Sequence, residues 1–189
     1  MKPRFILMAA LAAFSLLALA DTPARLPAPW ILAGKTPQNY STGIDPADVD
    51  GVRNAKFLRH EKGDGSGWAT MMQQISAENY VGKRVRFSAR VKTQDISNWA
   101  GLWLRVDTPG KPGAAFYNSA DKPIKGSTGW QARSVVLDVP VEARVVAFGV
   151  IGSGTGEVWL DALALEVVGD DVPVDVMPGA IALPTSPSL

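Results

Sequence analysis

The chain has 189 residues and is close to neutral, with 19 lysine and arginine residues against 18 aspartate and glutamate residues. Its overall charge therefore gives no argument for binding nucleic acid or an anionic membrane. It contains no cysteine and one histidine, which excludes disulfides, thiol catalysis, a lipid-anchored cysteine and cysteine-ligated metals. We expect one domain that is held together by an ordinary hydrophobic core.

Residues 1–20 have the pattern of a cleaved signal peptide. Lys2 and Arg4 precede an apolar stretch, and Ala18-Leu19-Ala20 offers the small-x-small pattern that a signal peptidase recognises. An uncleaved membrane anchor is the less favoured alternative, because the stretch is shorter than the roughly 20 apolar residues that span a bilayer. The sequence thus predicts a bacterial protein that is periplasmic or secreted, with no membrane span after cleavage.

The composition changes at both ends of the remaining chain. Residues 21–29 contain three prolines and are predicted to be an extended lead-in. Residues 169–189 combine prolines with small and acidic residues, and we expect a disordered, proline-rich tail there. The folded domain is then predicted to span residues 30–168.

Inside that domain, apolar residues recur with a period of two. Residues 84–92 and 102–107 alternate apolar with polar side chains, which predicts half-buried antiparallel strands. Further strands are predicted at 134–139, 144–151 and 157–168, and turns rich in glycine or proline lie at 63–67, 109–113 and 152–156. No long amphipathic helix is found, so the sequence predicts an all-β sandwich or barrel.

The second half of the chain resembles a known family. Gly82 opens an alternating strand, and a strand from Gly129-Trp130 to Val139-Pro140 is followed by a glycine turn and Val158-Trp159-Leu160-Asp161. Over residues 67–168 this order resembles carbohydrate-binding modules. The resemblance implies a two-sheet antiparallel jelly-roll (galactose-binding-like) β-sandwich. It also implies a structural calcium ion near Asp161, although Ala162 stands where the family has a second aspartate; no other cofactor is expected.

A second resemblance covers the middle of the chain. The run from Trp99 to Asp107, followed by Ala115-Phe116-Tyr117-Asn118 and Gly129-Trp130, is similar to a group of uncharacterised bacterial proteins. Some of those proteins are fused to transcriptional regulators. This sequence has no helix-turn-helix segment and carries the predicted signal peptide, so a regulatory role is not expected.

Catalysis is the least favoured class of function. His60 lies in a predicted strand, and no serine occupies a G-x-S-x-G motif. A glycosidase needs two carboxylates that face each other. Five acidic residues are candidates, but most of them border turns or strand ends, where turn formation explains them: Asp107, Asp121, Asp138, Glu157 and Asp161.

Trp103 is the candidate centre of a binding site. It is predicted to lie on the outer face of its strand beside Arg105, and a neighbouring strand would add Arg86 and Arg90. An aromatic ring stacks on a sugar ring, and guanidinium groups donate hydrogen bonds and favour acidic saccharides. The alternative is that a loop such as 107–127 covers this face, which would place Trp103 in a second small core.

Tyr117 and Asn118 are expected to line the same cleft, with the start of a strand as the alternative, while Trp68, Trp130 and Trp159 are expected to be structural. The predicted function is an exported, non-catalytic binding module for a saccharide or cell-wall glycan. The alternative is an envelope domain that binds protein partners through a sheet face or edge, and a hydrolase ranks third.

Overall fold

The computed structural model describes residues 22–179. The predicted signal peptide and residues 180–189 of the predicted tail lie outside the described residues. Within the described range the chain forms strands and one 3-10 turn, Pro37–Asn39. The strands are β1 (Ile31–Gly34), β2 (Tyr40–Ile44), β3 (Lys56–His60), β4 (Trp68–Ser76), β5 (Arg84–Thr108), β6 (Lys111–Tyr117), β7 (Ile124–Asp138), β8 (Val145–Ser153) and β9 (Glu157–Val168).

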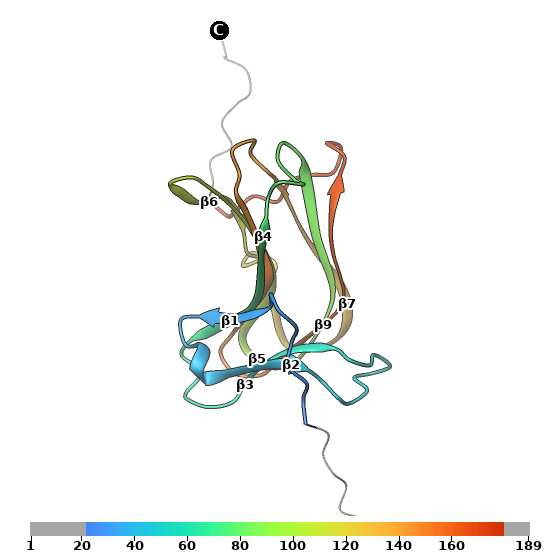
Figure 1. The fold of residues 1–189 in the computed structure, drawn as a ribbon. Coiled ribbons are helices and arrows are strands. Elements are labelled where there is room, and N and C mark those ends of the chain that lie inside the picture. The colour runs from blue at the N-terminus through green and yellow to red at the C-terminus, as the bar shows by residue number, and fades with distance from the viewer. Residues whose placement is uncertain (1–21, 180–189) are drawn as a thin grey trace, which may run out of the picture.

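The strands form two antiparallel layers that share β5. The first layer, called sheet I, has the order β1-β4-β8-β5-β6. The second layer, called sheet II, has the order β2-β3-β9-β5-β7. In Figure 1, β4 and β6 stand on one side of the molecule and β7 and β9 on the other. The predicted all-β, two-sheet jelly-roll sandwich is therefore confirmed.

Strand β5 crosses from one layer to the other. Its first half, up to Gln94, pairs with β9, and its second half, from Trp99, pairs with β8. The pairing register with β7 shifts three times between Val91 and Ala100, and Asp95 has a left-handed φ of 54°. These irregularities bend the strand between the layers. The two predicted strands at 84–92 and 102–107 are thus two halves of one strand.

The core lies between the layers, as the alternation predicts. Sheet II contributes Val85, Phe87 and Val91, which are fully buried, and sheet I contributes Leu104 and Val106 in the same state. Each such side chain stabilises the fold by about 1.5–3 kcal/mol through removal from water. The residues between them on β5, which include the arginines and Trp103, point to the outer faces.

The prediction of a disordered tail from residue 169 is wrong for residues 169–179. Val174 and Met177 pack against the core, and the Asp175 N–H donates to the Val136 carbonyl over 2.9 Å. The Asp175 carboxylate accepts a hydrogen bond from the Val136 N–H over 2.9 Å and lies 3.1 Å from the Lys122 ammonium group. Specific contacts at one carboxylate therefore anchor a segment whose composition resembles a linker.

In residues 22–179 no helix has the length and hydropathy to cross a bilayer.

Candidate ligand-binding groove

The crossing of β5 separates the residues of the predicted binding site. Arg86 and Arg90 belong to the half of β5 in sheet II, whereas Trp103 and Arg105 belong to the half in sheet I. Their side chains point to opposite outer faces of the sandwich. The predicted cluster of one tryptophan and three arginines is therefore wrong.

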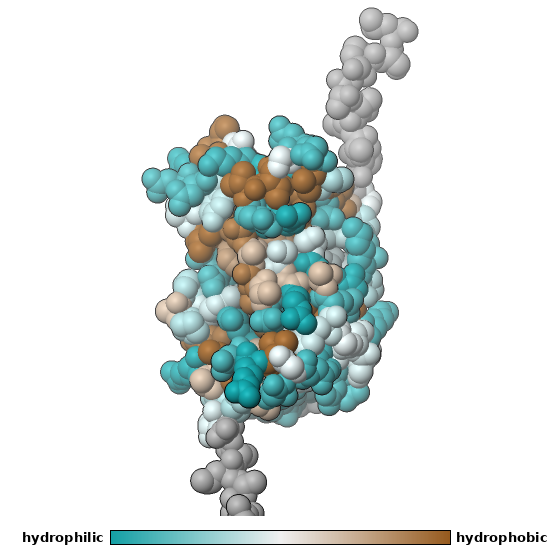
Figure 2. Space-filling model, turned by 90° about the vertical axis from the view of Figure 1, so that its right-hand side faces the viewer, coloured by the Kyte–Doolittle hydropathy of each residue, from teal (hydrophilic) through white to brown (hydrophobic). Residues whose placement is uncertain are grey.

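The outer face of sheet II is a ladder of ion pairs, which we call the ladder face. Arg86 lies 2.9 Å from Glu166, Arg90 lies 3.4 Å from Asp161, and Arg84 lies 2.7 Å from Asp138. Figure 2 shows the side of the molecule on which β7 and β9 lie, with polar residues spread over it and hydrophobic residues gathered mainly near its upper end. Each of these arginines has a carboxylate partner across the sheet, so the charges of this face are balanced in pairs.

Asp161, the predicted calcium ligand, faces the guanidinium group of an arginine. Its carboxylate is the partner of Arg90 on the ladder face. No group of three histidine or acidic side chains that could hold a metal gathers among the residues that the structure describes. The calcium site at Asp161 stays a prediction that the observed surroundings do not support.

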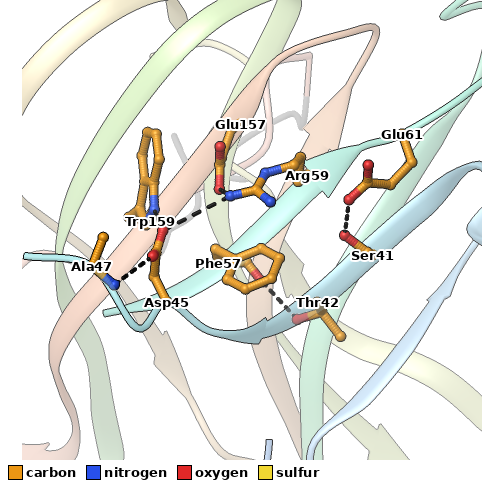
Figure 3. A network of polar contacts seen from close by, with 9 residues as sticks. All are labelled: Ser41, Thr42, Asp45, Ala47, Phe57, Arg59, Glu61, Glu157 and Trp159. Carbon is orange, nitrogen blue, oxygen red and sulfur yellow. Dashed lines mark hydrogen bonds and ion pairs between the residues drawn. The ribbon is translucent and has the colours of Figure 1, made fainter. Parts of the chain in front are cut away.

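A polar network fastens β2 and β3 to the lower end of β9 (Figure 3). Arg59 donates to Glu157 over 2.7 Å, and the Trp159 indole N–H donates to Asp45 over 2.9 Å. Burial raises the pKa of the Glu157 carboxyl, and the hydrogen bond and charge of Arg59 only partly oppose that shift. The network is built from paired groups, so its carboxylates serve the fold.

The five carboxylates that were candidates for a glycosidase pair are all engaged. Asp107 pairs with Arg105, Asp121 accepts from Tyr117, Asp138 pairs with Arg84, Glu157 pairs with Arg59, and Asp161 pairs with Arg90. His60 packs edge-on against the Tyr40 ring, with the ring centres 5.1 Å apart. Neither arrangement resembles a pair of opposed acids or a serine–histidine dyad.

Trp103 is buried in a small cluster on the outer face of sheet I. It is 4% exposed and packs with Met72 and Ala147. Its indole N–H donates to the Thr70 hydroxyl over 2.7 Å, and that hydroxyl donates to the Val150 carbonyl over 2.8 Å. The prediction of an exposed stacking plate is wrong. The alternative of a second small core is observed, although side chains of neighbouring strands form it.

A groove of about 380 Å³ lies above this cluster. Three of its lining side chains are large, apolar and open to solvent: Ile31 is 47% exposed, Trp68 is 39% exposed and Phe116 is 38% exposed. Ile31 and Phe116 belong to the two edge strands of sheet I, so the groove crosses the whole sheet. Its residues are Ile31, Ala33, Gly34, Trp68, Thr70, Met72, Gln74, Trp103, Arg105, Phe116 and Ile151.

The strand register gives the groove its length and its floor. Along β4 it extends from Trp68 to Gln74, which corresponds to about 20 Å at roughly 3.3 Å per residue. Gly149 of β8 pairs with both Met72 and Trp103. A Cβ on Gly149 would lie 2.2 Å from the Met71 carbonyl oxygen, so only glycine fits between the two strands.

Tyr117 and Asn118 do not line this groove, contrary to the prediction. Tyr117 points into the core and is 1% exposed, and its hydroxyl donates to Asp121 over 2.6 Å. Burial, with help from Asp121, raises the pKa of Tyr117. Asn118 closes a turn by accepting from the Ala120 N–H over 3.1 Å.

Phe116 was not singled out from the sequence, and Trp68, which was expected to be structural, lines the groove with 39% of its surface exposed. Because successive residues of a strand face opposite sides, an inward Tyr117 places Phe116 outward into the groove. The alternation was present in the sequence, but it predicts an outward Phe116 only if Tyr117 is known to point inward. Trp68 carried no such signal, because it stands at the first position of its strand.

Sequence comparison finds one curated relative of this chain. No protein-family model matches the chain. Over 145 residues the chain is 39% identical to the uncharacterised HTH-type transcriptional regulator YbfP of Bacillus subtilis (strain 168), a match that covers 76% of this chain and 49% of that protein. The chain therefore spans about half the length of the curated relative that it matches. The predicted similarity to uncharacterised proteins, some of them regulators, is confirmed.

Solved structures show the same jelly-roll fold. The C-terminal family 22 carbohydrate-binding module of Clostridium thermocellum Xyn10B has a TM-score of 0.55 at 14% identity, with 75% of this chain and 88% of that chain covered. A xylan-binding domain of the same module family has a TM-score of 0.52 at 11% identity, with 74% and 87% covered. The fold is therefore that of carbohydrate-binding modules, as the sequence resemblance predicted.

Proposed function

We propose that this chain is a non-catalytic saccharide-binding module and that the groove on sheet I is its binding site. The observation that carries the proposal is the pair of open aromatic side chains, Trp68 and Phe116, on the walls of an apolar groove. An aromatic face covers the apolar C–H face of a sugar ring. The fold, which the chain shares with carbohydrate-binding modules, supports the same function.

The polar groups of the groove suit the hydroxyl groups of a sugar. Gln74 offers an amide donor and acceptor, and Arg105 offers guanidinium donors. Both lie at the end of the groove that Phe116 closes, because Gln74 and Arg105 pair with the same residue of β8, Ala147. A sugar ring stacked on Phe116 would have Arg105 at its edge, because Arg105 is the cross-strand neighbour of Phe116, and Gln74 lies three strands from Phe116.

The types of side chain that line the groove fit a binding role without catalysis. No carboxylate and no histidine stands among the described residues that line the groove. The acidic residues considered as catalytic candidates are all held in ion pairs or hydrogen bonds. Four of them lie away from the groove, and Asp107 pairs with Arg105 beside it.

Binding to soluble oligosaccharides and to insoluble cell-wall glycans tests the proposal. We expect Trp68→Ala and Phe116→Ala each to weaken binding by roughly tenfold, which corresponds to about 1.4 kcal/mol of lost stacking and burial. Val141→Ala is the matched control, because Val141 is 77% exposed and lies outside the groove. A folded protein that binds no glycan, or aromatic variants that bind like the wild type, would contradict the proposal.

A protein-binding role is the second candidate. The apolar residues that dominate the groove also suit the side chains of an extended peptide. Selection from a random peptide library separates the two functions. Enrichment of apolar peptides that Trp68→Ala abolishes and that oligosaccharides do not displace would favour the second candidate.

We also propose that the protein is exported and acts outside the cytoplasm. The support is the sequence of residues 1–20, which has the charge, apolar stretch and cleavage pattern of a signal peptide. Intact-mass measurement of the protein from cell fractions tests this. The expected species begins at Asp21 and is found in the periplasm or medium, whereas a full-length species in the cytoplasm would contradict export.

A further inference from the structure

We infer that the groove selects neutral saccharides over acidic ones, and that Asp107 sets this preference by neutralising Arg105. The inference rests on the saccharide binding proposed above and specifies the class of saccharide. It reverses the preference for acidic sugars that the sequence suggested.

Arg105 carries the charge of the groove. Among the described residues that line the groove, it is the one with an ionisable side chain. Its cross-strand partner is Phe116, so the guanidinium group stands beside an open aromatic ring. An arginine without a partner at this position would attract a carboxylate and bind it through two parallel hydrogen bonds.

Asp107 fills that role from the next outward position of β5, beside Arg105 and outside the residues that line the groove. The Arg105 Nη2 group donates to Asp107 Oδ2 over 3.0 Å. Arg105 Nε lies 2.9 Å from Asp107 Oδ1, within ion-pair range. The Asp107 side chain is 20% exposed and does not line the groove.

The hairpin between β5 and β6 fixes Asp107 in this position. The Gly113 N–H donates to Asp107 Oδ1 over 2.7 Å. Gly113 has a φ of 69°, which is in the left-handed region where glycine is favoured. The backbone of β6 thus holds the carboxylate against Arg105, and the ion pair does not depend on two freely moving side chains.

This arrangement treats neutral and acidic ligands differently. A ligand hydroxyl needs only a donor, and Asp107 leaves the N–H groups of Nη1 free to donate. A ligand carboxylate at the same place would meet a guanidinium whose charge is already balanced, and it would lie close to the like charge of Asp107. Asp107 therefore acts as a positioning residue that removes the attraction for anions and keeps the hydrogen-bond donors.

Two pairs of oligosaccharides matched in length test the inference by calorimetry. They are cellotetraose with its C6-oxidised, glucuronate-containing form, and galactotetraose with tetragalacturonate. We expect the wild type to prefer the neutral member of a pair that binds. Its affinity for the acidic member should change little between low and high salt, because the charge of Arg105 is already balanced, whereas a contact between an unpaired arginine and a carboxylate would weaken with salt.

Asp107→Asn keeps the size and one acceptor oxygen but removes the charge. We expect it to raise the affinity for the acidic member relative to the neutral one by roughly tenfold, the effect of a freed charge-assisted hydrogen bond. Asp138→Asn is the matched control, because it removes the same charge from the ion pair with Arg84 on the ladder face. Arg105→Gln should weaken binding of the neutral member.

The outcomes separate the two proposals. A wild type that prefers the acidic member, or that binds the acidic member less tightly as salt increases, overturns the inference and leaves saccharide binding intact. The same applies if Asp107→Asn and Asp138→Asn change the ratio equally while both remain folded. A folded wild type that binds neither member, and no glycan in the wider screen, overturns the proposed function itself.

Discussion

Thr70→Val should destabilise the protein. Thr70 and Trp103 are each 4% exposed, and the Thr70 hydroxyl is the acceptor for the Trp103 indole N–H. Valine has the same shape as threonine but offers no acceptor. The variant therefore leaves a buried N–H unpaired, which costs about 1–3 kcal/mol.

That cost corresponds to a lower melting temperature by roughly 2–12 °C, since a domain of this size loses about 2–4 °C per kcal/mol. Urea denaturation measures the free energy directly through the transition midpoint. Thr70→Ser is the control, because it keeps the hydroxyl and removes one methyl group. Combining Thr70→Val with Trp103→Phe should recover part of the loss, because the phenylalanine leaves no unpaired N–H.

Binding gives the second readout. Thr70 and Trp103 line the floor of the groove but are each only 4% exposed. Folded Thr70→Val should therefore keep its affinity for saccharides within about twofold of the wild type. Trp103→Ala would be a poor substitute, because truncating a buried tryptophan costs about 3–5 kcal/mol, and lost binding would then report unfolding. The reasoning is refuted if Thr70→Val is as stable as Thr70→Ser.

Three further predictions concern other parts of the fold. Gly149→Ala should cost about 3 kcal/mol in urea denaturation, because the new Cβ would meet backbone atoms of β4, whereas Gly129→Ala should be nearly neutral, because nothing lies within 4 Å of a Cβ there. The raised pKa of Glu157 means that the folded state holds this proton more tightly than the unfolded chain. Its contribution to stability is therefore full below the unfolded pKa of about 4.3 and is lost as the pH rises through the folded pKa. Glu157→Gln should flatten this decline above the unfolded pKa, and an unchanged slope would contradict the assignment. Asp175→Ala should speed hydrogen exchange at Val136 and in residues 169–179, because it removes the acceptor of the Val136 N–H; unchanged protection there would show that the packing of Val174 and Met177 holds the segment alone.

Local alternation was sufficient to predict the strands and the inner face. The pattern of residues 84–92 separates Val85 and Phe87 from the arginines, and the structure buries the apolar set as predicted. The bend of β5 could not be predicted in this way. It depends on the shifts of pairing register with β7 and on the left-handed Asp95, and both arise from contacts between distant strands.

The candidate site depended on the same distant contacts. Placing Trp103 outward was correct, but its exposure is decided by Met72 and Thr70 on β4, two strands away. The sequence contains no signal for which strands are neighbours. An outward tryptophan can therefore be either a stacking plate or the centre of a small core, and only the neighbouring strands distinguish the two.

The two outer faces carry similar residues and yet suit different roles. On the ladder face the tryptophans are used to hold the loop before β3, since the Trp130 indole donates to the Val49 carbonyl over 2.9 Å and the Trp159 indole donates to Asp45. A ligand on that face would have to compete with hydrogen bonds and ion pairs that already exist. On sheet I, Trp68 and Phe116 keep more than a third of their surface open. Stacking on them requires no existing contact to break, so the face with fewer charges is the better binding face.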